Sequence, residues 1–210
     1  MTLLNDFNIN WGEYEMYGRR QFLENKSIIY KQGEVGNGFY YLKKGLVKVV
    51  TKTAGRKDLL LKIVLPNQLV GIQAMDQLVH YTTAQTIEKS VLYFFHYDTI
   101  EKLMLEKPEM NHLFLQSVIN EMNSLAVKIS AEGLPAEQKL AILLLNIYDE
   151  FSQYNIPLLQ KDIVSSTGLT RITIYKIFKE WTEKGYIEPT GKSLSIKNPS
   201  ILKKYAKGLY

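Results

Sequence analysis

The side chains best suited to recognising another molecule lie in the stretch "GLTRITIYKIFKEW" (168–181). At helical spacing its apolar residues fall on one face and its basic and polar residues on another. An exposed arginine can donate two hydrogen bonds to O6 and N7 of guanine, and lysines attract phosphates. We therefore expect DNA contacts from Thr170, Arg171, Ile172, Thr173, Tyr175, Lys176 and Lys179. The alternative is an ordinary amphipathic helix with a solvated polar face.

Helix signals on both sides of Gly168 define the structure that positions these side chains. Residues 160–167 predict a short helix, and Gly168 permits a turn after it. Thr170 is a good N-cap for a second helix, which ends near Gly185. The buried face of this second helix is expected to hold Ile174, Ile177, Phe178 and Trp181. The pattern predicts a helix-turn-helix whose second helix enters the major groove of DNA.

The segment "YIEPTGKSLSI" (186–196) predicts two short strands around a Thr-Gly-Lys turn. Such a wing would place Lys192 against a DNA phosphate. The charge of the chain agrees with this, since residues 155–210 hold ten Lys and Arg against four Asp and Glu. Residues 1–154 hold sixteen against seventeen, so the whole positive excess lies at the C-terminal end. A solvated lysine-rich tail is the alternative explanation of the charge alone.

The first half of the chain has the pattern of a β domain. Short β-branched and aromatic runs separated by turn signals predict strands at 27–30, 39–42, 46–51, 59–65, 84–87 and 90–95. The segment 51–58 has the composition of a hairpin tip between two of them. Many short strands at close spacing predict a small antiparallel barrel or sandwich. We expect an effector-sensing β-roll at residues 1–107.

A short helix capped by Asp98 and running to Lys107 is expected next, and Pro108 begins a longer one. Apolar residues recur in this longer helix at three- and four-residue steps: Met110, Leu113, Phe114, Val118, Met122, Leu125 and Ile129. This stripe would either cover the chain's own barrel or pair with a second copy of the chain, and we favour pairing. Gly133 and Pro135 break the pattern. A dimerisation helix and hinge are expected at 108–134, and the DNA-binding domain at 135–210.

Three stretches in order resemble the Crp/Fnr family of bacterial transcription regulators. Residues 28–50 resemble the opening of the family's β-roll, 139–147 the helix that begins its DNA-binding domain, and 168–181 its recognition helix. The resemblance implies an α+β fold: an antiparallel, cyclic-nucleotide-binding-like jelly roll, a long dimerisation helix and a winged helix-turn-helix. It also implies a homodimer that binds a palindromic operator in double-stranded DNA, with RNA polymerase as a further candidate partner.

The resemblance gives three recognition-helix residues a role. Arg171 takes the place of the arginine that reads guanine, and Lys176 falls where many members have arginine, so it keeps the charge but loses the bidentate fork. Ile172 replaces a glutamate of the cyclic-AMP-responsive members. An isoleucine cannot accept a hydrogen bond from cytosine and favours a thymine methyl group. A merely tolerated apolar residue at the surface is the alternative for Ile172.

The sensor half departs from the cyclic-AMP-responsive pattern. Ile72 stands opposite the family's ribose-binding glutamate, and Thr82 opposite its phosphate-binding arginine. A buried phosphate without a cation lacks the charge-assisted hydrogen bonds that offset its desolvation, so we expect no cyclic-AMP binding of the usual kind. An unidentified effector would lie near Gly71, Ile72, Gln73, Thr82, Thr83, Asn123 and Ser124. A purely structural role for each residue, and DNA binding without an effector, remain alternatives.

Composition narrows the remaining classes of function. The chain has no cysteine, which excludes iron–sulfur clusters, thiolate zinc sites and cysteine nucleophiles. His80, His96 and His112 are dispersed, so no metal site, other cofactor or catalytic residue is expected. The apolar runs are too short to span a membrane, and the N-terminus lacks a signal-peptide pattern, so a cytoplasmic protein is expected. Because the spaced His and Glu set of a metal enzyme is missing as well, we expect no enzyme. The alternatives are a cupin-type metal enzyme and a cyclic-nucleotide-binding regulatory module that does not act on DNA.

Overall fold

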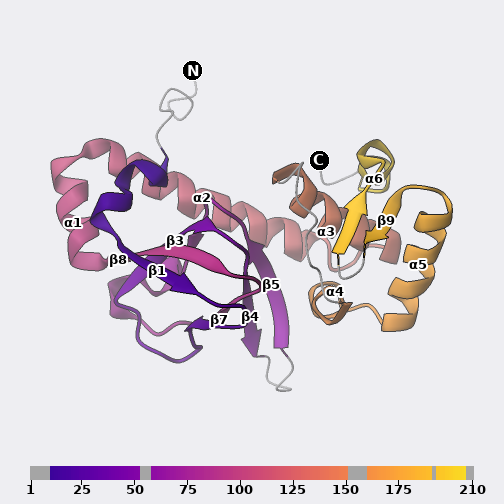
Figure 1. Ribbon diagram of the computed structural model, residues 1–210, viewed down its shortest axis with the longest axis horizontal. Coiled ribbons are helices and arrows are strands. Elements are labelled where there is room, and N and C mark those ends of the chain that lie inside the picture. Colours follow the sequence, from indigo (N-terminus) through magenta and orange to yellow (C-terminus); the bar gives the residue numbers. More distant parts are fainter. Residues whose placement is uncertain (1–9, 53–57, 151–159, 191–192, 207–210) are drawn as a thin grey trace. The chain divides into compact units, whose positions relative to one another are not determined.

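The computed structural model describes residues 10–52, 58–150, 160–190 and 193–206. The chain forms two compact units, Met1–Ser124 and Leu125–Tyr210. The boundary falls inside the long helix α2 (Pro108–Ser130), which therefore contributes residues to both units (Figure 1).

The first unit contains eight strands among the described residues. They are β1 (Arg19–Leu23), β2 (Ile28–Tyr30), β3 (Gly38–Lys44), β4 (Val47–Lys52), β5 (Asp58–Val64), β6 (Leu69–Val70), β7 (Thr83–Thr86) and β8 (Ser90–His96). The six predicted strands are confirmed as β2, β3, β4, β5, β7 and β8, whereas the sequence patterns did not predict β1 and β6. The pairing of Lys52 with Asp58 confirms the hairpin between β4 and β5, whose tip lies outside the described residues.

These strands form two antiparallel four-stranded sheets, in the orders β1-β8-β3-β6 and β2-β7-β4-β5. An apolar core joins the inner faces of the two sheets, with Leu42 and Leu92 from the first and Val47 and Val64 from the second. Alternation along each strand sends every second side chain into this core, which is the pattern of a sandwich or roll. The expected antiparallel β-roll is confirmed (Figure 1).

The outer face of the first sheet is covered by helices and supports a second core. The 3-10 helix η1 (Trp11–Tyr17), helix α1 (Tyr97–Glu106) and the start of α2 pack there against Phe39 and Phe95. A further 3-10 helix, η2 (Ile72–Gln77), contributes Ile72 and Met75 to the same core. The prediction that Asp98 caps α1 was wrong, because the cap is His96, whose Nδ1 accepts a hydrogen bond from the backbone N–H of Asp98 at 3.3 Å.

Helix α2 begins at Pro108 as expected, but its apolar stripe has a first part packed against the second core and a later, exposed part. Met110 is fully buried in the second core, and Leu113 and Phe114 pack against it. Met110 was therefore assigned wrongly as a dimer residue, because the outer face of the sheet buries it completely. Leu113 and Phe114 are only partly buried, and their place in a dimer contact stays a prediction. Further along, Met122, Leu125 and Ile129 are exposed, and Val118 is half-buried.

The second unit is a helical domain with a small two-stranded sheet. It contains α3 (Ala136–Glu150), α4 (Gln160–Thr167), α5 (Arg171–Glu183), β9 (Ile187–Thr190), β10 (Ser193–Ile196) and α6 (Pro199–Tyr205). One core holds the domain together, with buried residues from α3, α4, α5, β9 and α6. The break between α2 and α3, at residues 131–135, agrees with the predicted interruption at Gly133 and Pro135.

Candidate nucleic-acid interface

Helices α4 and α5 form the predicted helix-turn-helix. Gly168 links them with a positive φ of 69°, a conformation in which a side chain would be strained. The hydroxyl of Thr170 accepts a hydrogen bond from the backbone N–H of Thr173 at 3.1 Å, which confirms Thr170 as the N-cap of α5. The two threonine hydroxyls also lie within 2.9 Å of each other. Both residues thus help to fix the start of the helix.

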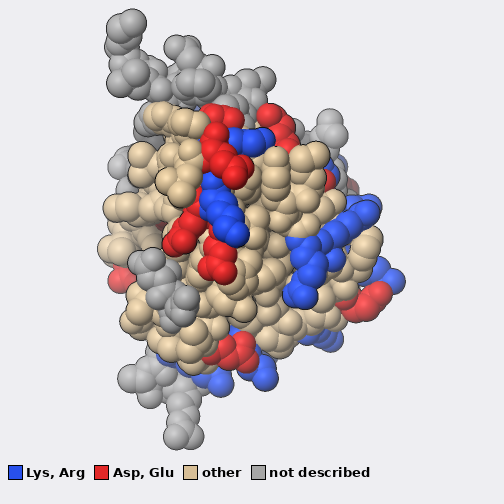
Figure 2. All heavy atoms as spheres, turned by 90° about the vertical axis from the view of Figure 1, so that its left-hand side faces the viewer, with Lys and Arg blue, Asp and Glu red and all other residues tan. Residues whose placement is uncertain are grey.

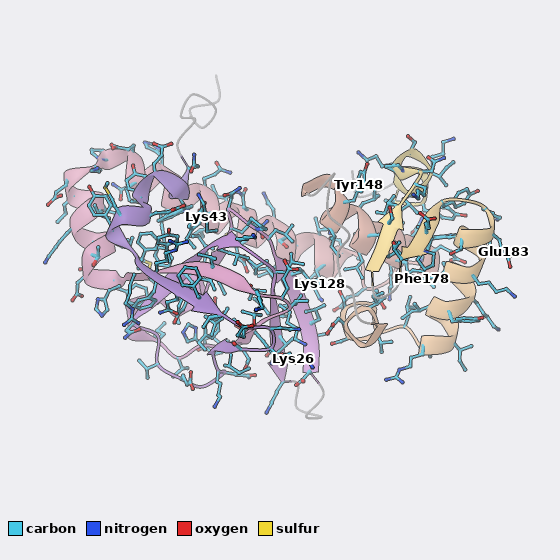
Figure 3. All side chains as sticks on the ribbon, in the orientation of Figure 1. Lys26, Lys43, Lys128, Tyr148, Phe178 and Glu183 are labelled. Carbon is cyan, nitrogen blue, oxygen red and sulfur yellow. The ribbon has the colours of Figure 1, made fainter. Side chains whose placement is uncertain are left out.

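The inner face of α5 anchors the helix in the domain core. Ile174, Ile177 and Trp181 are buried, and Phe178 packs partly against them, so the predicted apolar face is confirmed. The ring of Trp181 lies 5.4 Å from that of Tyr205 on α6, centroid to centroid. Phe178 and Glu183 lie on opposite sides of α5 (Figure 3). An anchored inner face leaves the orientation of the outer face well determined.

The outer face of α5 displays the residues that the sequence predicted to contact DNA. Arg171, Tyr175, Lys176 and Lys179 are exposed on it. Ile172 is 69% exposed and Tyr175 62%, so both present apolar surface to solvent beside the cations. Among the described residues, neither Arg171 nor Lys176 has an acidic side chain within ion-pair distance. Both cations are therefore available to another molecule.

Acidic side chains are confined to the C-terminal part of α5. Lys179 lies 3.9 Å from Glu183, and Lys184 lies 2.6 Å from Glu180. All four side chains are well exposed, so these pairs contribute little to stability. The first two turns of α5, which carry Arg171 and Lys176, contain no acidic residue. The positive charge is therefore strongest at the N-terminal half, the part of a recognition helix that meets base edges.

The predicted wing is present as the hairpin of β9 and β10. Thr190 pairs with Ser193, and Glu188 pairs with Ser195. Lys197, just after β10, forms an ion pair with Glu188 at 2.6 Å. Lys192, the residue predicted to contact a phosphate, lies outside the described residues.

The first unit shows a different charge distribution. The face shown in Figure 2 carries one cluster in which acidic and basic side chains adjoin and, to its right, a separate group of basic side chains. Within the first unit, ion pairs such as Lys43–Glu15, at 2.7 Å, neutralise part of the charge locally.

The residues predicted to line an effector pocket separate into groups. Gln73 and Thr82 come together, since Nε2 of Gln73 donates to Oγ1 of Thr82 at 2.8 Å. Ile72 was assigned wrongly, because it packs against the second core with Phe39. Thr83 accepts a hydrogen bond from the backbone N–H of Gln32 at 3.0 Å, a bond that holds two strand ends together. Asn123 and Ser124 are exposed on α2.

Two further residues belong to the Gln73–Thr82 group and were not predicted. The hydroxyl of Tyr30 lies 3.2 Å from both Nε2 of Gln73 and Oγ1 of Thr82. His80 stacks on the Tyr30 ring, with centroids 3.8 Å apart. Gly71 adjoins this ring, because a Cβ there would lie 3.0 Å from Cε1 of Tyr30. An isolated tyrosine at a strand end and an isolated histidine give no sequence signal for such a contact.

No group of three or more His, Asp or Glu side chains with a metal-binding arrangement occurs in the described part of the chain. Within the same residues, no helix is both long and apolar enough to cross a membrane.

Comparisons with known proteins agree with this geometry. The family model of the cyclic nucleotide-binding domain matches residues 20–107, and that of the Crp-like helix-turn-helix domain matches residues 138–205. The regulatory protein HlyX of Actinobacillus pleuropneumoniae is 24% identical over 186 residues, covering 85% of this chain and 78% of HlyX. The transcriptional activator FnrA of Stutzerimonas stutzeri is 21% identical over 182 residues, covering 83% of this chain and 75% of FnrA.

Solved structures share the fold. FixK2 from Bradyrhizobium japonicum superposes with a TM-score of 0.80 at 16% identity, covering 90% of this chain and 96% of FixK2. A CooA mutant from Carboxydothermus hydrogenoformans superposes with a TM-score of 0.75 at 17% identity, covering 97% of each chain. With both domain models in the family's order and the recognition helix exposed as described, the chain belongs to the Crp/Fnr family of DNA-binding transcription regulators.

Proposed function

We propose that this regulator acts as a homodimer whose two α5 helices read the two halves of a palindromic operator. The observation that carries the proposal is the joint exposure of Arg171, Ile172, Tyr175 and Lys176 on a helix held by a buried inner face. In a two-fold symmetric dimer the recognition helices lie about one DNA turn apart, roughly 34 Å, in successive major grooves. A palindrome is the sequence that matches such symmetry.

Each exposed side chain suits a particular contact. The guanidinium of Arg171 can donate to O6 and N7 of one guanine, and the ammonium of Lys176 supplies charge without the planar fork. Ile172 and Tyr175 are one helical turn apart, so their apolar surfaces adjoin on the exposed side. Such a surface fits the 5-methyl groups of thymines. The operator therefore combines a guanine with neighbouring thymines in each half-site.

The exposed part of the α2 stripe is the proposed dimer contact. Met122 is 64% exposed and Ile129 68%, with Leu125 between them. Residues at these spacings form one face of a helix, and pairing with the same face of a second copy would remove them from water. This contact begins after the part of α2 that covers the β-roll.

The proposed role is regulatory rather than catalytic, and it requires no resident cofactor. The protein would respond to an unidentified effector or bind DNA without one, and RNA polymerase is the proposed partner at promoters. Action on bacterial DNA would place it in the cytoplasm. Neither a cupin-type metal enzyme nor a regulatory module acting only on proteins needs the exposed cationic face of α5.

A selection experiment tests the proposal. Purified protein is mixed with genomic DNA fragments at about 0.15 M salt, and bound fragments are sequenced. The expected result is enrichment of a short palindrome, with an affinity that falls steeply as salt rises because bound cations displace counterions from phosphates. If no sequence is enriched, either with protein alone or after addition of cell extract, the proposal is wrong. Salt-independent capture of a protein would favour the module that does not act on DNA.

A further inference from the structure

A polar cluster of four side chains lies at the β-roll, three of them buried and the fourth, Gln73, exposed. It consists of Tyr30 on β2, Gln73 on η2, and His80 and Thr82 just before β7. Three distances connect the polar atoms: Gln73 Nε2 to Thr82 Oγ1 at 2.8 Å, and the Tyr30 hydroxyl to each of these atoms at 3.2 Å. The amide of Gln73 has two N–H groups, so it can donate to both oxygens at once. The polar atoms of Tyr30, Gln73 and Thr82 therefore bond to one another, whereas Nδ1 of His80 is buried without a hydrogen-bond partner among the described residues.

The Tyr30 ring is the centre of this cluster. Tyr30 is buried, and its ring is stacked on the imidazole of His80 at an interplanar angle of 13°. Burial raises the pKa of the Tyr30 phenol, so the group is neutral. The ring also lies against Gly71, whose positive φ of 91° and missing side chain leave room for it.

The same positions were expected to line an effector pocket. Gly71, Gln73 and Thr82 each contact the Tyr30 ring or its hydroxyl, so the groups that would recognise a small molecule already have a partner. The stacked face of the aromatic ring, and the hydroxyl held by an amide and an alcohol, resemble the contacts of a bound ligand. None of the four side chains carries a permanent positive charge.

We propose that the phenol ring of Tyr30 is an internal ligand of the β-roll, which fills the effector position and holds the protein ready for DNA binding without a small molecule. The consequence for DNA rests on the proposed function; the occupancy of the site does not. Replacement of an external ligand by a covalently attached one removes the loss of translational entropy on binding. The site is therefore always occupied.

Helix η2 connects this cluster to the long helix. Gln73 points to Tyr30, whereas Ile72 and Met75 of the same short helix pack against the core that includes Met110 of α2. Leu113 and Phe114 of α2 pack against that core as well. Loss of the Tyr30 ring would remove a hydrogen-bond partner of Gln73 and loosen η2. The core that η2 shares with the start of α2 would then pack less firmly. A packed chain of this kind can pass a change in the roll to the helix that forms the proposed dimer.

Side-chain removal and chemical rescue test the internal ligand. Tyr30→Ala leaves a cavity shaped for p-cresol, which is the tyrosine side chain as a free molecule; toluene fills the same space without a hydroxyl. We expect Tyr30→Ala to lower the melting temperature, and millimolar p-cresol to restore it more than toluene does. Tyr40→Ala removes another partly buried tyrosine of the roll and is the control, with no preference for p-cresol over toluene. Equal rescue of both variants, or no rescue of Tyr30→Ala, overturns the internal ligand.

Operator binding gives the second measurement. Wild-type protein refolded from denaturant into ligand-free buffer should bind its selected operator with unchanged affinity, and Tyr30→Ala should bind it about tenfold or more weakly until p-cresol is added. If Tyr30→Ala does not fold, Tyr30→Phe keeps the stack but loses the hydroxyl, and it should lie between the two. A refolded wild type that needs cell extract to bind its operator overturns the proposal. A wild type that binds no operator at all refutes the proposed function instead, and the thermal rescue still decides the site.

Discussion

The hydroxyl of Thr170 accepts a hydrogen bond from the backbone N–H of Thr173 at 3.1 Å, and this bond sets where α5 begins. Arg171 is the next residue, so its position in space depends on the same cap. The inner anchors Ile174 and Trp181 then fix the rotation of the helix. The capping hydrogen bond and the buried core together present the outer face of α5 to solvent.

Removal of the cap should weaken both the domain and its DNA binding. Thr170→Ala leaves N–H groups at the start of α5 without a partner, and we expect it to lower the free energy of unfolding by about 0.5–2 kcal/mol. Thr170→Ser keeps the acceptor and should stay close to wild type. Urea titration of both variants measures the effect. An alanine variant as stable as the serine variant would show that the capping hydrogen bond of Thr170 does not stabilise the domain.

Replacement of thymine by uracil in the operator tests the apolar part of the α5 face. Uracil lacks only the 5-methyl group, so loss of one methyl contact with Ile172 should weaken binding by about 0.8 kcal/mol, or about fourfold in Kd. Ile172→Ala should already have lost this contact and should bind both DNAs alike. Uracil placed outside the half-sites is the control. A methyl effect that persists at full size in Ile172→Ala would show that Ile172 does not read the thymine.

A charge on the exposed stripe of α2 should prevent dimerisation. Ile129→Asp would place a carboxylate in the proposed contact, where its desolvation has no compensation. Sedimentation should show the wild type at about twice the chain mass of 24.2 kDa and the variant at one chain mass. Leu105→Asp, which alters an even more exposed apolar residue on α1, is the control and should remain dimeric. A dimeric Ile129→Asp protein would place the contact elsewhere.

Stability should depend on pH through His80. Burial lowers the pKa of His80, while the nearby carboxylate of Glu34 opposes the shift and the neutral phenol of Tyr30 adds no charge. The unfolded chain takes up a proton below pH about 6.5, and the folded chain does so only at lower pH. The contribution of His80 to the free energy of unfolding should therefore be greatest above pH about 6.5. Below that pH the free energy of unfolding should decrease, by up to about 1.4 kcal/mol per pH unit.

Urea midpoints at pH 7.5 and 5.5 measure this dependence. His80→Phe keeps an aromatic ring over Tyr30 but does not titrate, so its midpoint should change less between the two pH values. A pH dependence that is the same in wild type and His80→Phe would assign it to other groups.

Local patterns predicted much of this architecture. Alternating β-branched and aromatic residues located six strands, and the threonine cap and glycine turn located α4 and α5. Strand β1 was missed because its two arginines interrupt the apolar pattern. Strand β6 was missed because it has only two residues, too few to show an alternating pattern. Helical periodicity gave the face of α2 on which Met110 lies, but it cannot say which surface covers that face.

Sequence patterns did not predict the Tyr30–His80 stack either, because the stack depends on contacts between distant segments of the chain. The two rings are 50 residues apart and meet because the chain segments around Val35 and Val79 pair across the roll. Such pairing depends on the tertiary arrangement of the whole sheet. In contrast, the exposed face of α5 follows from one helix and one core, so its residues could be predicted from 14 positions of sequence.

Paired titrations of two variants test most directly whether α5 reads base sequence. Affinities of Arg171→Ala and Lys192→Ala are measured on the selected operator and on random duplex at one salt concentration. Arg171→Ala should lose about 1–3 kcal/mol on the operator and little on random DNA, because only the operator offers its guanine. Lys192→Ala should weaken both DNAs alike. Equal losses on operator and random duplex for Arg171→Ala would contradict the account.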